Sequence, residues 1–224
     1  MAIQSGFTPS GLTQDSFFNM VTGAGALYYG IDYDDVTPKT TKAQFAKKLQ
    51  EAKENNKALG ATDGGCTVAM TPRIRQITVD DLLQPIAGST VMDGWENVTI
   101  STTAKETTKK KIEQVMSTAR VNTKTGALEF GSSLTSDHFD NEVTLAVRTI
   151  GDTLMVFRLK GALNTSGLSI TTTSGGEGTY AVSFSGHLKD LADIERDIAP
   201  LSIYEFAADG MVKIDPGQGT TPSP

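Results

Sequence analysis

The sequence has few of the side chains that build disulfide frameworks and metal centres. Its 224 residues include one cysteine, Cys66, and two histidines, His138 and His187. A single cysteine excludes an internal disulfide framework and a sulfur-based zinc cluster, and we expect Cys66 to be a small buried residue. The two histidines lie far apart in the sequence, without a second nitrogen or sulfur ligand at zinc spacing. We therefore expect no metal site and no secreted, disulfide-stapled domain.

Long apolar runs and excess positive charge are also lacking. No stretch approaches the roughly 20 apolar residues of a membrane-spanning helix, and the N-terminal MAIQSGFTPS has neither the basic patch nor the apolar core of a secretory signal. Lys and Arg total 20 against 26 Asp and Glu, a formal charge of -6. An acidic surface repels nucleic acid and anionic lipid. We expect a chain that is soluble where it is made, with no membrane partner and no sequence-specific binding of DNA.

Converging catalytic groups are equally scarce. The glycines of GAGALYYG have the wrong spacing for a dinucleotide loop, and neither a phosphate-binding loop nor a G-x-S-x-G turn is present. Adjacent carboxylates such as Asp34 and Asp35 would point to opposite faces of a strand. Asp137, His138 and Asp140 lack the ligand number and the loop glycine of a calcium site, which favours a surface loop. We expect no catalytic residues, no cofactor and no enzyme.

Alternating apolar and polar residues predict a mainly β, α+β chain. With 38% hydrophobic and 21% charged residues, its length fits one globular domain with additional arms. Pro72 indicates a bulge, an edge position or a break, and Trp95 is interpreted as core packing at the start of a strand. Hairpins are expected at Gly151-Asp152 and at a glycine-rich turn. The predicted strands are GAGALYY, CTVAMTP, RIRQITV, WENVTISTT, EVTLAVRTI, TLMVFRLKGAL, GLSITTT and GTYAVSFSGHL.

Two segments have the 3.6-residue period of helices. From Thr40 to Gly60 a narrow apolar stripe is flanked by charged residues, which indicates a helix lying against a surface. From Ala104 to Ala119 the pattern predicts a second helix, with Thr103 and Glu106 as a capping box. Its lysines, within KETTKKK, are interpreted as a solvated face. The apolar stripes are Phe45, Leu49 and Ala52 in the first helix and Ile112, Val115, Met116 and Ala119 in the second.

Several predicted strands have one apolar face and one face of small hydroxyl residues. In GTYAVSFS, the apolar Tyr180, Val182 and Phe184 alternate with threonine, alanine and serine. Exposed strands usually carry Lys or Glu, which block edge-to-edge pairing, so such a face indicates surface covered by other subunits or lining a channel. The alternative is that threonine is simply a good strand former. Composition leaves both interpretations open.

The order of motifs along the chain resembles the tail tube proteins of long-tailed bacteriophages that infect Gram-positive bacteria. The resemblance is carried by GAGALYYGIDYDD, a helix-bearing linker, ALGATDGGCTVAMTPRIRQI, VMDGWENVTISTTA and TLMVFRLKGALNTSGLSITTTSGGEGTYAVSFSGHL, and it covers about residues 20 to 206. It implies a β-sandwich or small barrel with one packed helix and a long arm. Copies would join their sheets into rings, and the rings would stack into a tube that conducts phage DNA.

The resemblance also implies partners and candidate assembly residues. Residues 32–64 would form a helix-bearing arm that reaches a neighbouring copy and orders on assembly. Besides other copies of the chain, the partners would be the tape measure protein, the tail terminator and distal tail proteins, and DNA in passage. The protein would assemble in the host cytoplasm and reside in the virion. The candidate assembly residues are Asp32, Asp34, Asp35, Phe45, Leu49, Gly64 and Gly65.

Domain boundaries follow from the same pattern. Residues 1–206 are expected to form a single domain, and residues 207–224, ending in DPGQGTTPSP, a flexible tail. Two alternatives share the fold: the tube protein of a contractile tail or type VI secretion system, and a β-sandwich module that binds a receptor or carbohydrate. The second would need clustered exposed aromatic residues, and the chain is 7% aromatic.

Overall fold

The computed structural model describes residues 16–78, 84, 86–172, 174–189, 192, 194 and 198–212. This part of the chain is mainly β, with antiparallel sheets and two α-helices, as predicted. The longer elements are β1 (Val21–Tyr29), α1 (Lys42–Glu54), β2 (Thr62–Gln76), β3 (Thr90–Ala104), α2 (Lys109–Val115), β6 (Val143–Thr149), β7 (Leu154–Leu159), β10 (Thr179–Ser185) and β11 (Leu201–Ala207). The shorter strands are β4 (Ala119–Val121), β5 (Leu128–Phe130), β8 (Leu163–Asn164), β9 (Ile170–Thr171) and β12 (Gly210–Met211).

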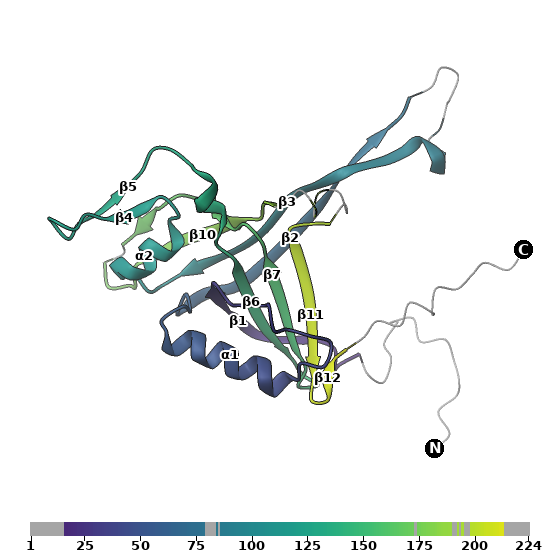
Figure 1. Cartoon of the computed structure of the whole chain (residues 1–224), viewed down its shortest axis with the longest axis horizontal. Coiled ribbons are helices and arrows are strands. Elements are labelled where there is room, and N and C mark those ends of the chain that lie inside the picture. Colours follow the sequence, from purple (N-terminus) through teal and green to yellow (C-terminus); the bar gives the residue numbers. More distant parts are fainter. Residues whose placement is uncertain are drawn as a thin grey trace, which may run out of the picture.

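Two antiparallel sheets pack face to face around the main core. The first sheet has the strand order β1-β6-β7-β11-β12, and the second has the order β2-β3-β10-β8, with β9 paired to β10. Apolar side chains of β1, β6 and β7 meet those of β3 and β10 between the sheets. Figure 1 shows the strands of the first sheet running away from the second, with α1 alongside them. A second apolar cluster joins α1 to the first sheet.

Helix α1 begins at Lys42, two residues later than predicted, and ends at Glu54, well before Gly60. Thr41 is its N-cap: the Gln44 backbone N–H donates to the Thr41 hydroxyl, and the Gln44 side chain accepts from the Thr41 N–H. The ring of Phe45 is fully buried and stacks on Phe206 of β11 at 4.6 Å between ring centroids. Full burial of a side chain of this size stabilises the fold by about 1.5–3 kcal/mol. Because α1 packs on its own sheet in this way, residues 32–64 do not form the projecting arm that was expected.

Helix α2 is shorter than predicted, and its predicted cap is wrong. Ala104 is the last residue of β3 and pairs with Tyr180, so the β-ladder continues through the expected helix start. The Glu106 carboxylate accepts from the Ala61 N–H instead of capping a helix. The helix begins at Lys109, after the N-cap Thr108. Strand pairing therefore overrides the local helical pattern at Ala104, and the helix begins five residues later than predicted.

Strand β2 runs through Pro72 without a break. The register with β3 shifts between Ala69 and Thr71 and again between Arg73 and Ile74, so the proline lies between two irregularities. In the strand order of its sheet β2 is an outer strand, a position where a residue without an N–H is tolerated. The edge interpretation of Pro72 is confirmed, and the irregularities lie on either side of it, with their extra residues on β3. A break is wrong, because CTVAMTP and the following RIRQ belong to one strand.

Both predicted hairpins are present. β6 and β7 pair antiparallel around a turn in which Asp152 has φ +67°, and β9 pairs with β10. The segment TLMVFRLKGAL is divided, because the chain leaves the first sheet after β7 and enters the second at β8. Gly161 makes this crossing possible. Its φ is +54°, and a Cβ there would lie 2.3 Å from the carbonyl oxygen of His187.

The C-terminal end of the described chain differs from the expected tail. Residues 207–212 include the turn into β12, which pairs with β11. Met211 packs against the cluster beneath α1, and the Val212 N–H donates to the Glu205 carbonyl at 2.8 Å. The predicted tail therefore begins too early at 207. The rest of it, DPGQGTTPSP, lies outside the described residues.

Candidate assembly interface

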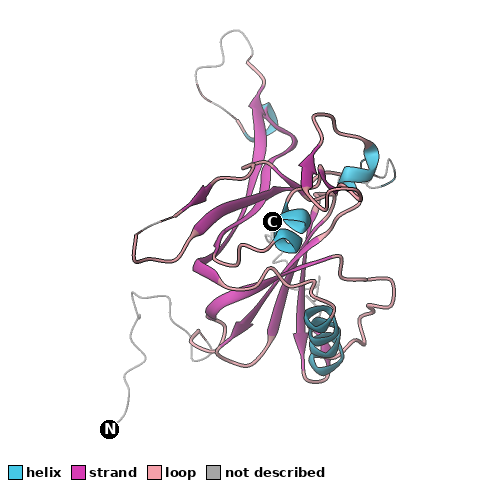
Figure 2. Ribbon diagram, turned by 90° about the vertical axis from the view of Figure 1, so that its left-hand side faces the viewer, coloured by secondary structure: helices cyan, strands magenta, loops and turns pink. Residues whose placement is uncertain are grey.

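The outer half of the β2–β3 hairpin extends beyond the sandwich. Figures 1 and 2 show this ribbon projecting past the rest of the two sheets. The side chains of Met70 to Gln76 on β2 are all exposed. An isolated two-stranded ribbon is at best marginally stable in water, so a long unsupported one indicates a surface that packs against something else.

One face of the projecting ribbon is apolar, and it continues the face that packs in the core. On β2, Cys66 and Val68 pack against the main core, and Met70, Pro72 and Ile74 follow on the same face at the two-residue spacing of a strand. On β3, Trp95 pairs with Pro72 and Met92 with Ile74, so these side chains share that face. We call Met70, Pro72, Ile74, Met92 and Trp95 the hairpin face.

The side chains of the hairpin face are largely uncovered. Ile74 is 61% exposed and Met92 46%. Trp95 is 38% exposed, so the prediction that it lies in the core is wrong. Contiguous exposed apolar side chains of this kind mark interaction sites on soluble proteins.

The opposite face of the ribbon is charged and internally paired. Arg73 lies 3.6 Å from the Glu96 carboxylate, and Arg75 donates two hydrogen bonds to Asp93, at 2.9 and 3.2 Å. These bonds from Arg75 hold the pKa of the Asp93 carboxyl below its ordinary value. The ribbon is therefore amphipathic, with paired charges toward solvent on one side and uncovered apolar side chains on the other.

An irregularity in β3 places Trp95 on the apolar face. Ala69 pairs with Thr99 and Thr71 with Glu96, so β3 uses one more residue than β2 over this stretch. Asn97, within it, has φ +50°, a left-handed conformation that asparagine adopts more readily than most residues. The extra residue reverses the alternation along β3, so that beyond it the odd-numbered Trp95 lies on the same face as the even-numbered core residue Val98. Strict alternation from Val98 backwards would assign Trp95 to the wrong face.

A pocket of about 420 Å³ continues the hairpin face onto the body of the protein. It lies between the hairpin at Trp95 and the segment after β10. Ile194 and Ile198 in its wall are 53% and 38% exposed. The remaining lining residues are Asp93, Gly94, Gly186, His187, Leu188 and Pro200.

The candidate assembly residues named from the sequence lie elsewhere. Phe45 and Leu49 are buried in the core beneath α1 and are not available to a partner. The acidic turn of Asp32, Asp34 and Asp35 is exposed, with Asp35 paired to Lys48 of α1 and the Asp32 carboxylate accepting from the Asp34 N–H at 2.9 Å. This turn is held against α1 of its own chain.

Gly64 and Gly65 lie on β2 at the Asp63/Cys66 register shift. Both glycines have positive φ, +70° and +80°, and the Thr102 hydroxyl donates to the Gly65 carbonyl at 2.7 Å. They shape the base of the hairpin, on the same strand as the hairpin face. Of the residues named from the sequence, this pair lies closest along the chain to the surface that the structure singles out.

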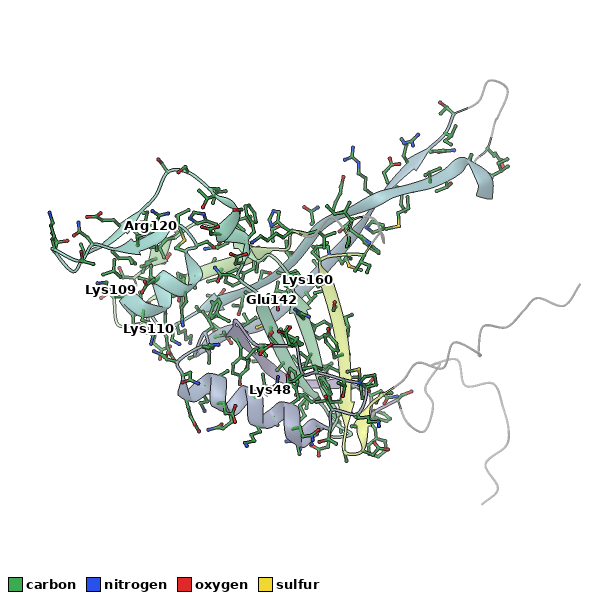
Figure 3. The ribbon with its side chains drawn as sticks, viewed as in Figure 1. Lys48, Lys109, Lys110, Arg120, Glu142 and Lys160 are labelled. Carbon is green, nitrogen blue, oxygen red and sulfur yellow. The ribbon has the colours of Figure 1, made fainter. Side chains whose placement is uncertain are left out.

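The lysine-rich segment KETTKKK is only partly a solvated face. Figure 3 shows Lys109 and Lys110 on α2 and Arg120 on β4. Lys111 is only 5% exposed and donates to the Ala58 carbonyl, and burial lowers the pKa of its amine. Lys111 therefore fastens α2 to the segment that follows α1.

Hydroxyl-rich residues cover the outer face of the second sheet, as the alternation predicted. Ser101 and Thr103 of β3 and Ala181 and Ser183 of β10 alternate with the core residues of the same strands. Together with Gly64 and its neighbours on β2 they line a shallow hollow of about 370 Å³. Tyr180, Val182 and Phe184 are buried on the other face.

Within the described part of the chain, His, Cys, Asp and Glu form no cluster of three or more that could hold a metal ion. His138 is buried, and its Nδ1 atom accepts from the Thr135 N–H at 2.9 Å. Among the same residues no helix has the length and apolar character to cross a membrane.

Comparison with protein-family models gives no match, and comparison with curated proteins gives none either. The amphipathic hairpin and the motif order of the sequence are thus the features that bear on function.

Proposed function

We propose that this chain is a structural protein that assembles with copies of itself, and that it forms the tail tube of a long-tailed bacteriophage. The single observation that supports self-assembly most strongly is the hairpin face, an extension of the core face whose side chains are exposed and which no described part of the second layer covers. Surfaces that resemble a core cut in half are typical of obligate interfaces between subunits.

The tail tube assignment rests on the resemblance of motif order, together with three features that suit it. The fold is a mainly β sandwich with one helix packed on a sheet. Its formal charge of -6 would weaken adhesion of DNA to a surrounding protein wall. The hydroxyl-rich outer face of the second sheet suits a surface that faces a channel or a neighbouring subunit.

In this proposal the copies form rings, the rings stack into a tube, and DNA passes through it without sequence-specific contacts. The tape measure, tail terminator and distal tail proteins would be the other partners, and the assembled protein would lie in the virion. A tube protein of a contractile tail or type VI system would use the same surfaces, with a sheath around the tube.

The proposal predicts concentration-dependent assembly that depends on the hairpin face. Negative-stain electron microscopy and light scattering of the purified chain, up to its solubility limit, are expected to show rings or hollow tubes. Met92→Asp places a charge on the hairpin face at a side chain that is 46% exposed, so it is expected to abolish tubes without unfolding the monomer. Persistent monomers of the unaltered chain would contradict the proposal.

Trp95 beside its pocket is the observation that favours the second candidate, a binding module for a receptor or carbohydrate. An exposed indole at the rim of a pocket is a common feature of small-ligand sites. Quenching of the Trp95 fluorescence by a glycan, in a chain that stays monomeric, would support this candidate in place of a tube.

A further inference from the structure

A second group of exposed apolar side chains lies where β1 begins and where β6 turns into β7. Phe17, Phe18, Met20, Val21 and Ile150 are each between 44% and 57% exposed. We call these five residues the foot patch. Exposed apolar clusters of this kind are uncommon on monomeric proteins, and the chain has one here in addition to the hairpin face.

Backbone hydrogen bonds fix the two segments of the foot patch to each other. The Ile150 N–H donates to the Met20 carbonyl at 2.9 Å, and the Gly151 N–H donates to the Phe18 carbonyl at 2.8 Å. A Cβ on Gly151 would lie 2.9 Å from that Phe18 carbonyl oxygen, so the two segments approach closely. The patch is therefore preformed, which lowers the entropy cost of docking a partner on it.

Charged side chains border the foot patch. Asp152 follows Ile150 by two residues and pairs with both Lys42 of α1 and Arg148 of β6. An apolar centre with a polar rim is the usual anatomy of a protein interface. The hairpin face is similarly bordered by the Arg73–Glu96 and Arg75–Asp93 pairs.

The two apolar surfaces lie at opposite ends of the molecule. In Figure 1 the hairpin projects from the end of the second sheet, while the β6–β7 turn lies at the far end of the first sheet, next to β12. Figure 2 shows from the side how the hairpin projects beyond one end of the molecule. The two surfaces are too far apart to cover each other within one chain, and each needs a separate molecule.

Each surface includes residues of an outer strand, with Met70, Pro72 and Ile74 on β2 and Val21 on β1. β2 is an outer strand of the second sheet and β1 of the first. Outer strands offer backbone N–H and C=O groups for pairing with another chain. The two surfaces can therefore combine apolar contact with strand pairing.

We infer that the foot patch of one copy covers the hairpin face of the next copy. Two different surfaces at opposite ends make a heterologous contact, which repeats from copy to copy and builds an open stack. The inference rests on the proposed self-assembly and names the partner surface of the hairpin. Hairpin-to-hairpin contact, by contrast, would give closed pairs that cannot extend.

Mixing two blocked variants tests this contact directly. Ile74→Asp blocks the hairpin face, and Ile150→Asp blocks the foot patch, with both side chains more than half exposed in the monomer. Alone, each variant is expected to stop at its smallest species, a monomer or a single ring. In an equimolar mixture the intact hairpin face of one variant meets the intact foot patch of the other. Analytical ultracentrifugation should then show a species with twice the mass of either variant alone, and no larger polymers.

Ile170→Asp is the matched control, because Ile170 is an exposed isoleucine of β9 outside both surfaces. It should assemble as the unaltered chain does. The urea midpoints of all three variants should match the unaltered chain, which shows that loss of assembly is not loss of folding.

The outcomes separate the inference from the proposed function. If the unaltered chain assembles but the mixture does not double in mass, the foot patch is not the partner of the hairpin and the inference is refuted alone. If Ile150→Asp by itself forms closed pairs, the hairpin face binds another hairpin face and not the foot patch, and the inference is refuted. If the unaltered chain never assembles, the proposed function fails and the inference fails with it.

Discussion

Two substitutions on the same face of β2 should affect different properties, one the assembly of the chain and the other the stability of the monomer. Ile74→Ala removes three carbon-bearing groups from a side chain that is 61% exposed in the monomer. At about 0.8 kcal/mol for each group, full burial of the lost atoms is worth about 2.4 kcal/mol. The share still exposed before assembly corresponds to about 1.5 kcal/mol. That is a roughly tenfold rise in the concentration needed for assembly.

Val68→Ala is the counterpart on the core side. Val68 lies six residues earlier on the same face and packs against the main core. Its truncation is expected to lower the free energy of unfolding of the monomer by about 1–2 kcal/mol, through lost apolar contact and a small cavity. Ile74→Ala should change that free energy by less than about 0.5 kcal/mol, as exposed substitutions usually do.

Two assays on the same samples measure these effects. Light scattering over a concentration series gives the assembly threshold, and urea unfolding of dilute monomer gives the free energy of unfolding. Ile170→Ala on β9 controls for loss of an exposed isoleucine from a strand. If Ile74→Ala weakened monomer folding and left the assembly threshold unchanged, the hairpin face would pack within its own chain and the reasoning would be refuted.

Two further predictions concern the fold that carries the hairpin. Phe45→Ala should destabilise the monomer by about 3–5 kcal/mol, because this ring is fully buried between α1 and the first sheet. A urea midpoint close to that of the unaltered chain would instead favour the expected arm of residues 32–64, which does not depend on packing within its own chain. Glu142→Gln should cost about 1–2 kcal/mol by urea unfolding, because it removes the charge partner of Arg158, bonded at 2.6 and 2.8 Å with both side chains less than a quarter exposed. The matched control is Glu51→Gln, because the pair of Glu51 with Lys47 is open to solvent and its loss should change the free energy of unfolding by less than about 0.5 kcal/mol. An equal effect of the two glutamine variants would show that the Arg158 pair is no stronger than a surface pair.

Local signals were sufficient where neighbouring residues decide the structure. Thr41 followed three residues later by Gln44 is a capping pair, and the start of α1 lies within two residues of the predicted one. The Gly151-Asp152 turn between two apolar runs predicts the β6–β7 hairpin, which is present. Each of these features depends on contacts within a few residues along the chain.

Non-local contacts account for what the sequence could not predict. The stripe of α1 looked too narrow for a core helix because its partners, Phe206 and Val156, come from strands more than 100 residues away. Lys111 looked solvated because its acceptor, the Ala58 carbonyl, lies 53 residues earlier. The start of α2 was misplaced because β10 pairs with Ala104 and extends β3.

The apolar face of β2 is visible in the sequence as an alternating pattern, but the proline within it obscured its continuity. Cys66, Val68, Met70, Pro72 and Ile74 alternate without interruption, but the segment was divided into two predicted strands at Pro72, which indicated a bulge, an edge position or a break. Because Pro72 lies on an outer strand, the ladder passes through it and the apolar face stays continuous. One alternating pattern thus serves the core in its first half and an uncovered surface in its second.

The transition between those halves is local and lies at Asn97. Together with the second register shift, between Arg73 and Ile74, the extra residue of β3 at this point keeps Trp95 and Met92 on the same side as the core residues Val98 and Ile100. Without it, the apolar side chains of β3 would point to the face opposite those of β2, and neither face of the ribbon would be continuously apolar. Since the core itself ends near Val98, this alignment contributes little to packing within the monomer. Its physical effect is one uninterrupted apolar surface, which is what the proposed self-assembly through the hairpin needs.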